Sequence, residues 1–146
     1  QAYPTPRQQV TIYEVPDATW ARLKATSDQE AAAALTKLAS EGQVTRHDEA
    51  RVHGFRFSFA RELRDGKGRD FQLSLVVYTP EVSAKRPSSG PPRLALSLDR
   101  QGEEGGRQSR RLEVEAPNPA LTTLVAAKLD AGPTQTHIVV VLTPLQ

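Results

Sequence analysis

Hydrophobic and polar residues alternate along most of this chain, so that apolar side chains recur at every second position. The alternation is clearest from Phe55 to Ala60 and from Phe71 to Tyr78. A period of two is typical of β-strands that bury one face and expose the other. The pattern predicts strands at 9–15, 44–52, 55–60, 71–78, 94–98, 112–116 and 136–142.

Short polar segments separate these strands and favour antiparallel pairing between neighbours. The segment Asp65-Gly66-Lys67-Gly68 is typical of a hairpin turn. Strands joined by links of turn length pair antiparallel, because a parallel pair needs a long crossover. Residues 121–130 fit either a helix that Pro119 opens or a further strand. We favour the strand, as part of a β-hairpin over 121–143.

One segment departs from the alternation and has the features of a helix. Ser27 and Glu30 form a capping box, in which the Ser side chain caps the helix and the Glu stands three residues later. Good helix formers follow, beginning with the alanines at 31–34. Gly42 stands where a glycine commonly ends a helix. The pattern predicts a helix over 28–41 with a narrow apolar stripe that packs on a sheet.

A shorter helix is expected between the first strand and this main helix. Asp17 follows Pro16, and its side chain is predicted to cap the N-terminus of this short helix. The short helix carries Trp20, the only tryptophan of the chain. We interpret Trp20 as the anchor of this helix to the sheet rather than as a ligand contact.

These elements predict an α+β fold, a mainly antiparallel sheet of about six to eight strands with one main helix at 28–41 packed on a face. The length fits a single domain over 1–146, with an extended N-terminal arm at 1–8 and a flexible loop at 83–92. The predicted core comprises Trp20, Leu35, Leu38, Phe57, Phe59, Leu73, Leu75, Leu96, Val114, Val139 and Val141.

Composition adds an expectation about the compartment. The chain contains no Cys, so disulfides and thiol chemistry are excluded. It contains no Met and begins with Gln1, which favours a mature exported protein without its signal peptide over a shortened sequence. No apolar run approaches the roughly 18 residues of a spanning helix. We therefore expect an exported protein, periplasmic or associated with a bacterial outer membrane, without a membrane-spanning helix.

The charge distribution suggests a second kind of partner. Residues 61–111 carry eleven basic and seven acidic side chains, a net charge of +4, against +2 for the whole chain. Two groups of arginines stand out in this basic middle region and could contact an anionic polymer or another partner. The candidate contacts are Arg61, Arg64, Arg69, Arg107, Arg110 and Arg111. The neighbouring phenylalanines share one alternating face and are interpreted as core, so nucleic acid is a disfavoured partner.

No pattern in the chain predicts a catalytic residue, a metal ligand or a cofactor. His47 and His53 lie six residues apart, which on a strand separates them by about 20 Å and prevents them from sharing one metal ion. Nucleotide-binding, hydrolase and metalloprotease fingerprints do not occur. A pocket that holds His47 or His137 beside a carboxylate would be needed to indicate an enzyme.

Several segments together resemble the β-domain of bacterial secretins. The resemblance lies in a first strand that ends in E-V-P, a helical stretch, a glycine that opens the next strand and a closing V-x-L-x-T-P strand; the matching segments are 10–16, 18–40, 41–44, 55–61, 129–132 and 139–144. Residues 55–70 lack a gate hairpin, and 146 residues leave no room for the N-terminal repeat domains. The resemblance implies a standalone form, an envelope location and assembly through β-sheets.

These expectations combine into one leading function and one alternative. The leading hypothesis is a non-enzymatic exported protein of the cell envelope, structural or adaptor, that acts through protein contacts or self-assembly. A role in an outer-membrane-associated secretion assembly follows from the resemblance to secretins. The alternative is a module that binds an anionic polymer, nucleic acid or polysaccharide, through the arginine clusters.

Overall fold

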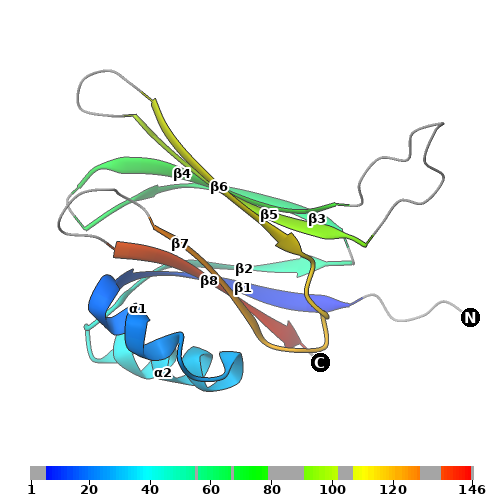
Figure 1. The fold of residues 1–146 in the computed structure, drawn as a ribbon, viewed down its shortest axis with the longest axis horizontal. Coiled ribbons are helices and arrows are strands. Elements are labelled where there is room, and N and C mark those ends of the chain that lie inside the picture. The colour runs from blue at the N-terminus through cyan, green and yellow to red at the C-terminus, as the bar shows by residue number, and fades with distance from the viewer. Residues whose placement is uncertain are drawn as a thin grey trace, which may run out of the picture. The chain divides into compact units, whose positions relative to one another are not determined.

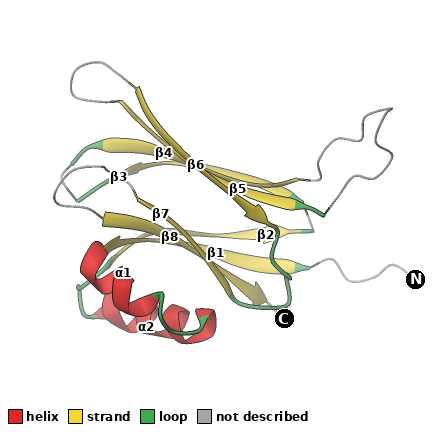
Figure 2. Cartoon of the chain, in the orientation of Figure 1, coloured by secondary structure: helices red, strands yellow, loops and turns green. Residues whose placement is uncertain are grey.

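The computed structural model describes residues 6–54, 56–66, 68–78, 91–101, 107–128 and 136–145. This part of the chain contains eight strands and two helices (Figures 1 and 2). In chain order they are β1 (Arg7–Pro16), α1 (Asp17–Leu23), α2 (Asp28–Ser40), β2 (Thr45–His53), β3 (Phe57–Arg64), β4 (Asp70–Tyr78), β5 (Arg93–Gln101), β6 (Arg107–Glu115), β7 (Thr123–Lys128) and β8 (Thr136–Leu145).

The strands form two four-stranded sheets, and contacts divide the chain into two compact units. The first unit, residues 1–52 and 119–146, holds the sheet β2-β1-β8-β7, and the second, residues 53–118, holds the sheet β3-β4-β5-β6. The predicted class, α+β with six to eight mainly antiparallel strands, is confirmed. The strands form two sheets instead of the single expected one. The last strand, β8, pairs with β1, and β7 pairs with β8, so these strands join the first sheet and do not extend the second.

The first unit is built on the pairing of β1 with β8. Their antiparallel register extends over ten residue pairs, from Arg7 opposite Leu145 to Pro16 opposite Thr136. Both helices lie on one face of this sheet (Figure 2). The core on that face includes residues from both helices and both central strands: Tyr13, Val15, Leu23, Ala31, Leu35, Val44, Val139 and Val141. Val10 and Ile12 on the opposite face of β1 are also buried.

The ends of α2 follow the predicted caps. The Ser27 hydroxyl oxygen accepts a hydrogen bond of 3.2 Å from the backbone N–H of Glu30. The helix ends at Ser40, one residue before the predicted end. Gly42 has a φ of +76°, a left-handed conformation that residues with a side chain rarely adopt. The capping signals in the sequence therefore determine both ends of this helix.

The predicted cap of α1 is wrong. Asp17 is the first residue of the helix, and Pro16 occupies the N-cap position without a side-chain hydrogen bond. The Asp17 carboxylate instead lies 2.6 Å from Nδ1 of His137 on β8. A proline is readily accommodated where a helix begins, because the first N–H groups of a helix have no partner within it.

The second unit has one apolar and one polar face. Phe71, Leu73, Leu75 and Val77 of β4 are buried on one face, while the residues between them are exposed or half-buried. The β3–β4 hairpin closes as the sequence predicts, with the backbone N–H of Gly68 donating to the carbonyl of Asp65 at 3.0 Å. Gly68 has a φ of +79°, which a short hairpin loop with a terminal glycine requires.

Most of the predicted core is confirmed. Seven of the expected residues are buried, namely Leu35, Phe59, Leu73, Leu75, Leu96, Val139 and Val141. Trp20, Leu38, Phe57 and Val114 are only half-buried. Buried residues outside this prediction include Val10, Ile12, Phe71, Leu94, Leu98, Ile138, Val140 and Leu142. Many of them lie in β1 and β8, the central strands of the first sheet, where side chains on both faces are buried, and residues 138–142 of β8 form a continuous apolar run.

The strand β7 and parts of the predicted arm and loop lie beside segments that the structure does not describe. β7 confirms that 121–130 contains a strand and not a helix. Residues 1–5 of the predicted arm and 83–90 of the predicted loop lie outside the described residues, while Arg7 and Gln8 already belong to β1. Neither helix in the described part of the chain has the length and apolar character needed to cross a membrane.

Candidate functional site

The two sheets are open, so each ends in two strands that are paired on one side only. In the described residues these edge strands are β2 and β7 in the first sheet and β3 and β6 in the second (Figure 1). An edge strand presents backbone N–H and C=O groups that another strand can pair with. The four edges are therefore candidate sites for a protein partner.

The direction of the backbone groups on β7 follows from one hydrogen bond. The N–H of Leu124 donates to the carboxylate of Asp28 on α2 at 3.2 Å, and so it points away from β8. Backbone groups alternate in direction along a strand. Ala126 and Lys128 therefore also direct their N–H and C=O groups away from β8, while 123, 125 and 127 pair with it. The carboxylate of Asp28 thus occupies the N–H of Leu124 near the beginning of the open edge. The N–H and C=O of Ala126, two residues further along the strand, lie beyond this hydrogen bond.

Charge distinguishes β7 from the other three edges. Lys128 is its only ionisable residue. Each of the other edges carries at least three charged residues within eight or nine positions, in the sequences TRHDEARVH, FSFARELR and RQSRRLEVE. Charges on an edge strand discourage pairing with another chain. Two residues before β7, Leu121 is 60% exposed and is the exposed large hydrophobic residue of the described chain.

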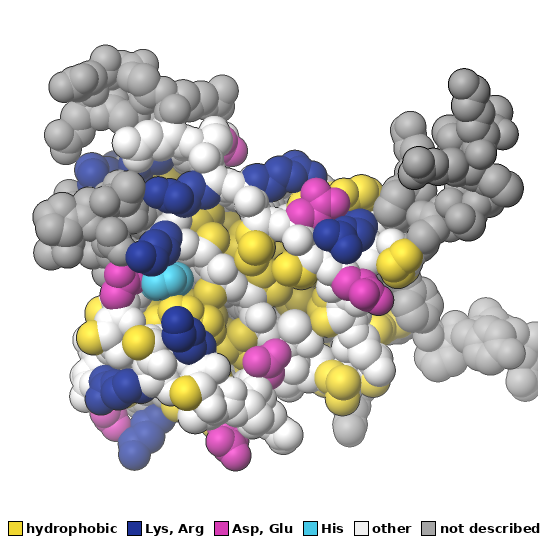
Figure 3. All heavy atoms as spheres, viewed as in Figure 1, with side chains coloured by type: hydrophobic (Ala, Val, Ile, Leu, Met, Phe, Trp, Pro, Cys, Tyr) yellow, Lys and Arg dark blue, Asp and Glu magenta, His cyan; other side chains and the backbone are white. Residues whose placement is uncertain are grey.

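The predicted arginine contacts do not come together in one place. Arg61 and Arg64 lie on β3, and Arg110 and Arg111 lie on β6, at the opposite edge of the second sheet. Three strand spacings separate these edges, about 14 Å. The face of the molecule in Figure 3 shows basic side chains interspersed with acidic and uncharged ones. The structure therefore separates the two clusters that the sequence analysis singled out.

Most of these arginines also have acidic or aromatic neighbours. Arg64 and Arg69 pair with Asp70 and Asp65, each at 3.2 Å. Arg61 places its guanidinium carbon 4.3 Å from the centre of the Phe59 ring. Arg111 lies 3.6 Å from Glu113, Arg110 is exposed, and the side chain of Arg107 is not among those described. Each intramolecular pair leaves less free charge for a polyanion.

A polar cluster on β4, β5 and β6 is a feature that sequence reasoning missed. The Glu113 carboxylate accepts from the hydroxyl of Tyr78 and lies 3.5 Å from Nε of Arg93. The hydrogen bond to ionised Glu113 raises the pKa of Tyr78 above its ordinary value and lowers the pKa of Glu113. These residues come from three strands, so only the register of the sheet brings them together.

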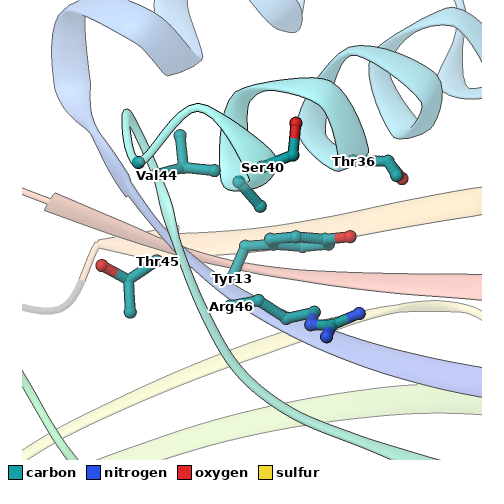
Figure 4. Close-up of a pocket in the computed structure, with 8 residues that line it drawn as sticks. Tyr13, Thr36, Ser40, Val44, Thr45 and Arg46 are labelled. Atoms are coloured by element: carbon teal, nitrogen blue, oxygen red, sulfur yellow. The ribbon is translucent and has the colours of Figure 1, made fainter.

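Two of the three histidines lie beside a carboxylate. His47 Nε2 is 2.8 Å from a carboxylate oxygen of Glu14, and His137 lies against Asp17 and 6.1 Å from the ring of Trp20. Burial lowers the pKa of His137, although the nearby Asp17 carboxylate acts in the opposite direction. Neither histidine lines the hollow shown in Figure 4. The contacts join neighbouring elements, His47 of β2 to Glu14 of β1 and His137 of β8 to Asp17 of α1.

Neither a search for metal-ligand clusters nor a comparison with known proteins identifies a further site. Among the residues that the structure describes, no group of three or more His, Cys, Asp or Glu side chains is placed to hold a metal ion. Comparison with protein-family models, with curated proteins and with solved structures finds no match to this chain. The function of the chain is therefore inferred from its own geometry.

Proposed function

We propose that this protein is a non-enzymatic adaptor that binds a protein partner by adding a strand of that partner to β7. The observation that carries the proposal is the weakly charged open edge of β7, next to the exposed Leu121. In strand addition, main-chain hydrogen bonds supply affinity and alternate side chains supply specificity. An edge with few charges suits such pairing better than the charged edges of β2, β3 and β6.

The backbone geometry defines what the partner contributes. An extended segment beside β7 would bond to the carbonyl of Leu124 and to the N–H and carbonyl of Ala126. Ala126 and Ala127 are small, so a partner backbone can approach closely. Leu121 offers an apolar contact beyond the beginning of the strand. These features favour a short apolar segment of another protein as the occupant.

A proline substitution tests the proposal without removing a bond inside the sheet. In Ala126→Pro the lost N–H is one that points away from β8, so the ladder between β7 and β8 keeps its hydrogen bonds. The matched control is Ala60→Pro on β3. The N–H of Ala60 also points outward, because the hairpin bond from Asp65 N–H to Arg69 carbonyl fixes the alternation along that strand. The two variants place the same change on two different edges.

The experiment compares complexes of the native chain and both variants in an envelope extract, by light scattering and by capture on the immobilised chain. We expect Ala126→Pro to lose the complex and Ala60→Pro to retain it. Loss in both variants, or in neither, contradicts strand addition at β7. Dimers of the chain alone that disappear only in Ala126→Pro would identify a second copy as the partner.

The compartment is a separate part of the proposal. Its support is the resemblance to secretin β-domains in the strands at 10–16 and 139–144. Fractionation of the native cells tests it, with the chain expected in the envelope fraction and not in the cytosol. The anionic-polymer alternative has less support, because Arg64 and Arg69 are each paired with a carboxylate at 3.2 Å.

A further inference from the structure

A hollow of about 540 Å³ lies between the C-terminal half of α2 and the beginning of β2 (Figure 4). All of its lining belongs to the first unit and comes from β1, α2 and the chain that leads into β2. The lining residues are Tyr13, Thr36, Ala39, Ser40, Gly42, Val44, Thr45 and Arg46. Its size is within the range of sites for small molecules, which is about 300–1,000 Å³.

Tyr13 provides a hydroxyl that is available to a ligand. The residue is 5% exposed and belongs to the core between the sheet and the helices. Its hydroxyl makes no hydrogen bond with another described residue and is not sealed from the surface. A buried tyrosine hydroxyl normally finds a partner. This hydroxyl therefore has an unused donor at the hollow.

Arg46 provides a positive charge in the same hollow. In Figure 4 the guanidinium of Arg46 and the hydroxyl of Tyr13 extend toward the same side of the hollow. The Arg46 side chain is 56% exposed, and its contact with Glu49 is a loose one of 3.6 Å. A planar guanidinium and a phenol together match the oxygens of a carboxylate. This side of the hollow is suited to an anionic group.

The helix wall presents acceptors instead of donors. The hydroxyl of Thr36 donates to the carbonyl of Ala32 at 3.2 Å, and the hydroxyl of Ser40 donates to the carbonyl of Lys37 at 2.6 Å. Because their hydrogens are used, both oxygens offer lone pairs to a ligand. Hydroxyl groups on a ligand would satisfy them.

The end of α2 has a weak opposing effect on an anion. A helix C-terminus carries about half a negative charge, spread over its last carbonyls. Three of these carbonyls already accept hydrogen bonds from the N–H groups of Glu41, Gly42 and Gln43. Arg46 is the one Lys, Arg, Asp or Glu residue among those that line the hollow, and Glu49, which lies 3.6 Å from it, is not part of the lining.

We propose that this hollow binds a small hydroxylated carboxylate, the chemical class of the sugar acids. Tyr13 and Arg46 bind the carboxylate, and the oxygens of Thr36 and Ser40 accept from hydroxyls of the ligand. Ala39 and Val44 contact its carbon skeleton. This site goes beyond the proposed adaptor function, because it uses neither β7 nor a protein partner.

The test is a titration of the full chain with D-glucuronate, in which binding is measured by the NMR chemical shifts of the residues that line the hollow. D-glucose lacks the carboxylate and acetate lacks the hydroxyls. We expect glucuronate to bind at least about tenfold more tightly than either, the usual size of a lost charge-assisted hydrogen bond. Equal affinities for the three compounds, or no saturable binding of glucuronate, overturn the proposal.

Two variants locate the binding. Tyr13→Phe removes an unpartnered hydroxyl and leaves the packed ring in place, so the fold is retained. Tyr13→Phe and Arg46→Gln should each raise the Kd for glucuronate about tenfold. Arg51→Gln is the matched control, because Arg51 is exposed on the same strand and does not line the hollow. Unchanged affinity in both variants, or an equal loss in the control, contradicts the site.

The same acid occurs free and as a unit of a polysaccharide. A uronate-containing hexasaccharide, titrated beside glucuronate, distinguishes the two sources. Tighter binding of the hexasaccharide identifies a polymer, and equal or weaker binding identifies the free acid. The Ala126→Pro variant should bind glucuronate normally, so this proposal and the adaptor function can fail separately.

Discussion

Arg100 of β5 and Asp65 of the β3–β4 turn form an ion pair whose side chains are only 4% and 3% exposed. The same carboxylate also accepts hydrogen bonds from the backbone N–H and from Nε of Arg69. Arg100 lies 5.9 Å from the centre of the Phe71 ring. One buried carboxylate therefore connects the hairpin turn with two arginines, one of them from the next hairpin.

Removal of this carboxylate is expected to destabilise the second unit. Asp65→Ala leaves the Arg100 charge buried without its carboxylate and should lower the free energy of unfolding by about 3–5 kcal/mol. Asp70→Ala is the control, because it breaks the exposed pair with Arg64 and should cost about 1 kcal/mol or less. Urea unfolding followed by circular dichroism measures both. Similar losses in the two variants would contradict a structural role for the buried pair.

The N-terminal cap of α2 should account for a measurable part of the stability of the first unit. Ser27→Ala removes the acceptor for the N–H of Glu30 and should cost about 1 kcal/mol. Ser40→Ala in the last turn removes no cap and should change stability by less than about 0.5 kcal/mol. Urea unfolding monitored by Trp20 fluorescence compares them. A cap variant as stable as the native chain would contradict this account of the helix start.

His137 should make the first unit less stable in mild acid. Its pKa in the folded state is lower than the ordinary value of 6.5, because burial disfavours the charged ring and Lys128 and Lys24 oppose it, although Asp17 favours the charge. As the pH falls through 6.5, the unfolded chain takes up the proton first, and stability decreases until the folded pKa is passed. Above 6.5 this contribution is constant.

A substitution isolates the effect of this histidine. His137→Gln should flatten the decrease in unfolding free energy between neutral pH and mild acid. His53→Gln, at an exposed position on β2, should leave the decrease as it is. Unfolding free energies measured across this pH range decide between the two. An unchanged slope in His137→Gln would show that other groups cause the acid sensitivity.

Tyr78 should titrate above the ordinary tyrosine value of 10.0, because its hydroxyl donates to ionised Glu113. Glu113→Gln removes the negative charge and should bring the pKa of Tyr78 down toward that value. NMR of ring-labelled tyrosine measures the titration of Tyr78 separately from that of the other tyrosines. A Tyr78 pKa that does not respond to Glu113→Gln would contradict the pairing across β4 and β6.

Local signals predicted the elements of this fold well. Ser27 and Gly42 marked the ends of α2, and the alternation from Phe71 to Tyr78 marked β4. Each signal depends on residues that are neighbours in the chain, where capping and alternation act. The capping signal failed at Asp17, because its carboxylate contacts His137 on the last strand instead of capping α1.

Long-range pairing was beyond prediction from one sequence. Nothing local indicates that β1 pairs with β8, which places Tyr13 opposite Val139, or that the strands divide into two sheets. The candidate site shares this dependence. The strand at β7 was predicted, but its position at an edge follows from sheet order, and the hollow beside Arg46 follows from the packing of α2 over Tyr13.

Amide hydrogen exchange at Ala126 tests the central claim most directly, because its N–H is the donor that a partner strand would use. The exchange rate is measured in the isolated chain and in the complex recovered from the envelope extract. The account predicts fast exchange in the isolated chain and strong protection in the complex. An Ala126 amide that exchanges equally fast in both states, while the complex remains intact, would contradict strand addition at β7.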